Sequence, residues 1–130
     1  MLENLELKIL EAIFDTLPVD VTFVDSTDTV KYYSRGDERI FRRTPAVIGK
    51  RVQDCHPPKS LDKVVQVVAD LKSGKKDVAE FWIDLKGRKI YIRYFAVRDK
   101  DGKYLGTLEV TQDITDIQKI AGEKRLLDMG

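Results

Sequence analysis

The chain has 130 residues, of which 42% are hydrophobic and 35% are charged, a composition typical of one soluble globular domain with a single core. Its 23 lysines and arginines nearly balance its 22 aspartates and glutamates, which argues against nucleic acid as the main partner, because phosphate binding requires a concentrated basic surplus. A single cysteine excludes an internal disulfide and favours the reducing cytoplasm, and no apolar run is long enough to cross a membrane.

The first half of the chain predicts a helix, a hairpin and a run of short turns. Residues 2–17 carry apolar side chains three and four positions apart, which is the spacing of an amphipathic helix, and Pro18 ends that helix. The β-branched and aromatic runs 20–25 and 29–34 predict the two strands of a hairpin. Residues 36–50 predict short helical turns.

The second half predicts one longer helix, three strands and a final helix. Residues 59–74 place apolar side chains at helical spacing, with Ser60 as the N-cap and Gly74 as the terminator. The three predicted strands cover residues 77–85, 88–99 and 103–113. Residues 114–130 again show helical spacing.

This order of elements predicts an α+β fold, with a five-stranded antiparallel sheet that carries helices on one face. We expect residues 1–17 to form an amphipathic flanking helix, residues 18–113 to form the core, and residues 114–130 to form an output or linker helix.

Two stretches resemble the PAS domain family. "RDKDGKYLGTLEVTQDIT" (98–115) is similar to the final, PAC-type hairpin of these domains, and "VIGKRVQDCHPP" (47–58) is similar to their middle section. The resemblance covers about residues 8–117. A narrower resemblance, carried by "RTPAVIGK", "CHPPKS" and "EFWI", links the chain to the PAS module at the end of proteins with hemerythrin-like (HHE) metal-binding domains.

The resemblance implies a non-enzymatic sensor or interaction module. In such a module the bent sheet and the central helices enclose a pocket for a small molecule or cofactor, and the flanking helices pass changes to an attached signalling domain. Two alternatives remain: a dimerisation module with a filled core and no ligand, and a haem-binding redox or gas sensor.

The only cysteine and the only histidine are neighbours, Cys55 and His56. A nucleophilic cysteine requires a base within hydrogen-bond reach, but adjacent residues in an irregular segment usually point apart, and Pro57 restricts His56 to extended geometry. We therefore expect neither catalysis nor a metal site within one chain.

His56 remains open to three roles: the axial ligand of a haem, a hydrogen-bond partner of a ligand at the pocket mouth, or part of a turn before the long helix. Haem-binding PAS domains usually carry their histidine on the long helix, and residues 59–74 contain none. The turn is therefore the simplest interpretation.

Flavin photochemistry is not expected. Light-sensing PAS domains place a reactive cysteine three residues after the glycine of their "IG" motif, where this chain has Val52. Thr111 stands where those domains have a flavin-holding glutamine, and Ile90 where they have an asparagine. The cofactor, if there is one, is not identified by the sequence.

The same similarity predicts which strand residues line the pocket. It turns Tyr94, Glu109 and Thr111 inward, and it also places Trp82 inward. Strand alternation alone allows the opposite assignment, in which Glu109 faces solvent. An inward Glu109 requires a partner because an unpaired buried carboxylate is costly, and the candidates are a ligand group, Tyr94 or His56.

Asp113 and Thr115 stand where the last strand meets the final predicted helix. The resemblance implies that this junction transmits a signal, and a plain helix N-cap at Asp113 is the alternative. The outer sheet face, with Tyr91, Phe95 and Val97, is too apolar to remain in water. We expect the first helix to cover it, within one chain or from a second chain, and therefore predict a homodimer.

Overall fold

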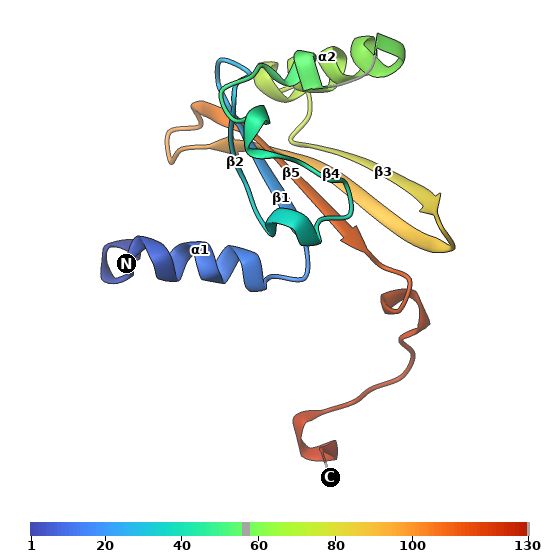
Figure 1. Cartoon of the computed structure of the whole chain (residues 1–130). Helices are drawn as coiled ribbons and strands as arrows, with labels where there is room; N and C mark the ends of the chain where they lie inside the picture. Colours follow the sequence, from blue (N-terminus) through green and yellow to red (C-terminus); the bar gives the residue numbers. More distant parts are fainter. Residues whose placement is uncertain (56–57, 130) are drawn as a thin grey trace.

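The computed structural model describes residues 1–55 and 58–129 and confirms the predicted α+β fold (Figure 1). One antiparallel sheet contains five strands in the order β2-β1-β5-β4-β3. The strands are β1 (Asp20–Asp25), β2 (Val30–Tyr33), β3 (Val78–Leu85), β4 (Arg88–Arg98) and β5 (Tyr104–Asp113). The α-helices are α1 (Leu7–Thr16) and α2 (Pro58–Ser73), and 3-10 turns cover Leu2–Asn4, Gly36–Glu38, Pro45–Val47, Val52–Cys55, Ile117–Lys119 and Leu126–Asp128.

The sheet joins the two halves of the chain at β1 and β5. β3, β4 and β5 follow each other as hairpins, and Lys86 and Gly87 form the first of these turns with positive φ angles of 50° and 78°, as a tight two-residue hairpin requires. β1 then pairs with β5, from Asp20 opposite Thr111 to Asp25 opposite Gly106. Inward-facing residues from both halves therefore share one surface.

Helix α2 packs on that surface, against β4 and β5. It begins at Pro58, whose fixed φ suits a first helical position, so Ser60 lies inside the first turn and the predicted N-cap at Ser60 is wrong. Gly74 follows the helix with a φ of 84°, the left-handed conformation expected of a terminating glycine. Leu71 of α2 is fully buried.

A small valine core joins α2 to the N-terminal hairpin. Its buried members are Val24, Val30, Val52 and Val68, with Val47 and Val64 packed against them. Asp28, in the turn of the hairpin, accepts a hydrogen bond from Lys72 Nζ (3.0 Å) and one from Gln53 Nε2 (3.3 Å). These contacts fix α2 over one end of the sheet.

Helix α1 does not cover the outer sheet face within one chain. Figure 1 shows α1 extending to one side of the sheet, and its ring contact with the strands is Phe14 against Tyr32, with centroids 5.8 Å apart. Ile9 and Ile13 are each 43% exposed, and no residue of α1 is buried. No helix among the described residues has the length and apolar character needed to cross a membrane.

The helix predicted over residues 114–130 is absent from the described part of that segment. Two single 3-10 turns, Ile117–Lys119 and Leu126–Asp128, stand in its place, and the chain runs away from the sheet (Figure 1). Ile120 is 76% exposed, so the apolar stripe has nothing to pack against. A short helix without tertiary contacts is marginal in water, which explains the difference.

Candidate functional site

The register of the sheet determines which residues face α2. Tyr94 of β4 lies opposite Glu109 of β5, and Glu109 lies opposite Thr22 of β1. Because directly opposite residues in neighbouring strands share a face, Tyr94, Glu109 and Thr111 all point to the α2 side of the sheet, as predicted. The alternative assignment, with Glu109 in solvent, is wrong.

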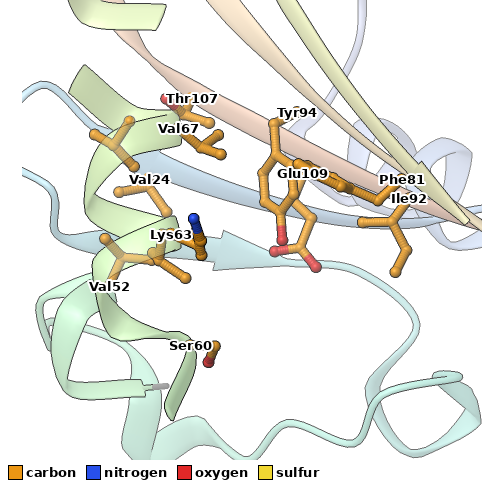
Figure 2. Close-up of a pocket in the computed structure, with 12 residues that line it drawn as sticks. Val24, Val52, Ser60, Lys63, Val67, Phe81, Ile92, Tyr94, Thr107 and Glu109 are labelled. Carbon is orange, nitrogen blue, oxygen red and sulfur yellow. The ribbon is translucent and has the colours of Figure 1, made fainter. Parts of the chain in front are cut away.

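A cavity of about 180 Å³ lies between α2 and this inner face (Figure 2). Its walls are mainly apolar, and its polar side chains are few. The apolar lining residues are Val24, Val52, Val64, Val67, Val68, Phe81 and Ile92, and the polar ones are Ser60, Lys63, Tyr94, Thr107 and Glu109. An apolar concave site with a few convergent polar groups is the usual form of a small-molecule pocket.

Glu109 is compensated by Arg43, a residue that the sequence analysis did not identify. Arg43 Nη2 lies 3.3 Å from Glu109 Oε2, and the two side chains are only 13% and 11% exposed. A buried carboxylate is stable when an opposite charge and a hydrogen bond offset its lost hydration. The basic cluster Arg42-Arg43 was the available signal, but an irregular segment gives no periodicity from which to assign a facing residue.

The segment that carries Arg43 is anchored by a second buried arginine, Arg39. Its Nη1 donates to the carbonyls of Ser34 (2.8 Å) and Val21 (3.1 Å). Asp20, also buried, accepts a hydrogen bond of 2.6 Å from the backbone N–H of Ile40. These bonds hold residues 34–43 across the inner face and thereby position Arg43.

Tyr94 supplies a hydroxyl that stays protonated. Burial, and secondarily the negative charge of Glu109, raise the pKa of Tyr94 well above its ordinary value. Neither this hydroxyl nor Glu109 Oε1 forms a hydrogen bond with another group in the described residues. The cavity therefore presents the Tyr94 hydroxyl beside a free carboxylate oxygen of Glu109.

Trp82 does not line the cavity, contrary to the prediction. It pairs with Tyr91 on the outer face and is 65% exposed, while Phe81, opposite Ile92, occupies the inward position. The pattern of β3 explains the difference, because Glu80, Trp82 and Asp84 form the more polar set of alternate residues. The resemblance to PAS domains therefore predicted the wrong set of alternate β3 residues to face the cavity.

Thr111 lies apart from the cavity. Thr111 is buried on the inner face but borders a different pocket of about 150 Å³, beside Asp20 and Arg35. The predicted roles of His56 fall outside the described residues. Tyr94 and Glu109 are thus the two predicted ligand-binding residues that the structure brings together at one cavity.

The end of β5 forms a separate ionic junction. Asp113 Oδ2 accepts from Arg88 Nε at 2.7 Å, Asp113 Oδ1 accepts from the N–H of Thr115 at 3.0 Å, and Thr115 Oγ1 accepts from the N–H of Lys89 at 2.8 Å. The bonds from Arg88, first, and from Thr115 lower the pKa of Asp113 to about 2. No α-helix follows among the described residues, so Asp113 caps a turn rather than a helix.

Comparisons with known proteins agree on one family. The sequence profile of the PAS domain family matches residues 10–115. The C-terminal domain of a Streptococcus mutans protein is 37% identical, with a TM-score of 0.85 over 90% of this chain and 91% of that chain. No curated protein sequence matches the chain.

Two more distant structures share the fold. A PAS domain from Colwellia psychrerythraea is 19% identical, with a TM-score of 0.59 over 85% of this chain and 98% of that one. A sensory box sensor histidine kinase from Vibrio cholerae is 14% identical, with a TM-score of 0.57 over 83% of this chain and 91% of that one.

Proposed function

This chain belongs to the PAS domain family, and from that premise we propose that it is a non-enzymatic sensor module that binds a small molecule in the cavity between α2 and the sheet. The observation that carries the proposal is the cavity itself, whose mainly apolar lining includes Glu109, the carboxylate that is paired with Arg43. A module with a purely structural core would bury apolar side chains there, because a charged pair contributes less to stability than well-packed apolar groups.

The signal leaves the module through β5 in this proposal. Glu109 borders the cavity and lies four residues before Asp113, on the same strand. A ligand that displaces β5 changes the geometry of the bond between Asp113 and Arg88, and the segment after Asp113 carries the change to an attached domain. The histidine kinase from Vibrio cholerae, which has the same fold, supports a signalling context.

The context we propose is a longer cytoplasmic protein that forms dimers. The Streptococcus mutans relative is described as a C-terminal domain, which supports a position at the end of a longer chain. The motifs "RTPAVIGK", "CHPPKS" and "EFWI" support a hemerythrin-like domain as the attached partner. The exposed apolar side chains of α1 support contact with a second copy.

Mass spectrometry of protein that is denatured only immediately before the measurement tests ligand binding. We expect one small molecule per chain in the wild type. Val67→Phe, which places a larger side chain in the cavity wall, should lose that molecule, whereas Val65→Phe, on an exposed position of the same helix, should retain it. Wild-type protein that carries no small molecule, or equal occupancy in Val67→Phe, would contradict the proposal.

A further inference from the structure

We infer that the ligand of this cavity is a neutral molecule of single-ring size that presents a hydrogen-bond donor next to an acceptor on one edge, as a lactam or a pyrimidinone does. This inference rests on the proposed function and specifies the chemical class of its ligand. Three features of the cavity carry it: its volume, the arrangement of its free polar groups and its charge balance.

The volume of the cavity suits a ligand of about one ring. The cavity measures about 180 Å³, and an engineered apolar cavity of about 150 Å³ in another protein holds one benzene molecule. Nucleotides, flavins and haem are much larger than this space. The apolar walls, five valines with Phe81 and Ile92, fit the two faces of a flat ring.

The free polar groups lie side by side. Tyr94 and Glu109 are directly opposite each other on β4 and β5, and Figure 2 shows the hydroxyl and the carboxylate pointing in the same direction into the cavity. The Thr107 hydroxyl is already engaged by the Tyr104 hydroxyl at 2.6 Å. Ser60 lies apart from the pair, near the start of α2 (Figure 2).

This arrangement favours a complementary ligand edge. The neutral Tyr94 hydroxyl has a proton to donate, so a ligand acceptor that faces it gains a hydrogen bond. The free oxygen of Glu109 accepts, so the neighbouring ligand atom must donate. A carbonyl next to a ring N–H satisfies both groups at once, and a ligand without the N–H leaves a buried carboxylate oxygen unpaired.

The charge balance favours a neutral ligand. Glu109 is already paired with Arg43, so a cationic ligand would bring an uncompensated positive charge into an apolar site. An anion would lie against Glu109, and the lining cation Lys63 is exposed on α2, where water weakens its attraction. A neutral ligand leaves the Arg43–Glu109 pair intact.

Calorimetric titration of the full chain with five probes tests the inference. The probes are 2-pyridone, N-methyl-2-pyridone, benzoate, benzylamine and benzene. We expect 2-pyridone to bind with one-to-one stoichiometry, and N-methyl-2-pyridone, which lacks the donor, to bind about tenfold more weakly. Benzoate and benzylamine should bind more weakly still.

Substitutions of Tyr94 and Glu109 test whether these two side chains select among the probes. Tyr94→Phe should weaken 2-pyridone binding about tenfold and leave benzene binding unchanged. Glu109→Gln removes the charge that balances Arg43 and should therefore improve benzoate binding relative to 2-pyridone. Trp82→Phe, on the outer face, is the matched aromatic control and should bind every probe as the wild type does.

Two results separate the ligand class from the proposed function. If benzoate or benzylamine binds more tightly than 2-pyridone, and Val67→Phe abolishes that binding, the ligand class is wrong but the cavity still binds ligands. If no probe binds the wild type and no small molecule accompanies it by mass spectrometry, both the ligand class and the proposed function are wrong.

Discussion

Arg43 and Glu109 come from distant parts of the chain, and the structure brings them together on the inner face of the sheet. Each side chain is largely withdrawn from water, so each depends on the other to offset its lost hydration. The cavity therefore depends on the segment 34–43 as much as on the strands. Arg39 and Asp20 hold that segment in place through backbone hydrogen bonds.

A double-mutant cycle measures the coupling between Arg43 and Glu109. We expect Arg43→Met and Glu109→Gln each to lower the free energy of unfolding by about 2–3 kcal/mol, because each substitution leaves the other, buried side chain without its oppositely charged partner. The double variant should lose about 1–2 kcal/mol less than the sum of the single losses. Urea unfolding gives all four values, and strictly additive losses would show that the two charges do not stabilise each other.

The junction at Asp113 predicts a specific response to acid. The folded pKa of Asp113, about 2, lies below the usual value of 3.8, so ionised Asp113 stabilises the fold above about pH 4, and this contribution disappears as the pH falls towards 2. Asp113→Asn should therefore be less stable than the wild type at pH 7, and the difference should vanish near pH 2. Thermal unfolding between pH 2 and pH 7 measures it.

Asp116→Asn is the matched control for this experiment. Asp116 also contacts Arg88, at 3.4 Å, but its side chain is far more exposed. We expect its substitution to change the melting temperature little at any pH. A pH dependence equal to that of Asp113→Asn would show that Arg88, rather than Asp113, carries the effect.

Single residues were predicted with uneven success, for identifiable reasons. The inward orientation of Tyr94 and Glu109 was predicted from the resemblance to PAS domains, because strand alternation alone left both assignments open. Trp82 was assigned to the wrong face because the similarity outweighed the polarity pattern of its own strand. Arg43 was missed because it follows no periodic pattern, so its position depends on tertiary contacts alone.

The strands were predicted closely because their local signals agree with their tertiary environment. Each strand combines alternating polarity with a turn at its end, and the structure places all five within a few residues of the expected ranges. The tail over residues 114–130 shows helical spacing without a surface to pack against, and periodicity alone does not stabilise a helix. The sequence specifies an apolar stripe there but not its partner.

Substitution of Gly106 in β5 tests how closely β5 packs against β1. A Cβ atom at this position would contact the carbonyl oxygen of Val24 and lie 2.5 Å from Cζ of Phe23. Gly106→Ala should therefore destabilise the protein by about 3 kcal/mol, because the carbonyl belongs to a paired strand and cannot move freely. Chemical denaturation provides the measurement.

Gly102→Ala is the control for steric crowding. Gly102 has a φ of 83°, and a Cβ there would meet no atom within 4 Å, so only backbone strain opposes the alanine. We expect a loss of about 1 kcal/mol. Equal losses for Gly102→Ala and Gly106→Ala would refute close packing between β5 and β1.

The whole molecule presents two apolar surfaces that one chain leaves open. On the outer sheet face Arg93 stacks over the rings of Tyr91, at 4.7 Å, and Phe95, at 5.5 Å, and Trp82 extends this surface. Helix α1 carries a second apolar stripe, in which Ile9 and Ile13 are each 43% exposed. Two copies could cover both surfaces together, which a single copy does not do.

Substitutions in α1 test the proposed dimer. In Ile9→Ser/Ile13→Ser, we expect the dimer dissociation constant to rise at least about 1000-fold, because each isoleucine withdrawn from an interface costs roughly 1–2 kcal/mol and a symmetric dimer loses four of them. Light scattering coupled to size-exclusion chromatography should show the mass falling from two chains to one. Leu126→Ser/Leu127→Ser, which removes apolar side chains that are even more exposed, should leave the dimer intact. An interface through α1 would be contradicted by a wild type that is monomeric at high concentration, or by a dimer that only the tail substitutions disrupt. The outer sheet face would then need a different partner to cover it.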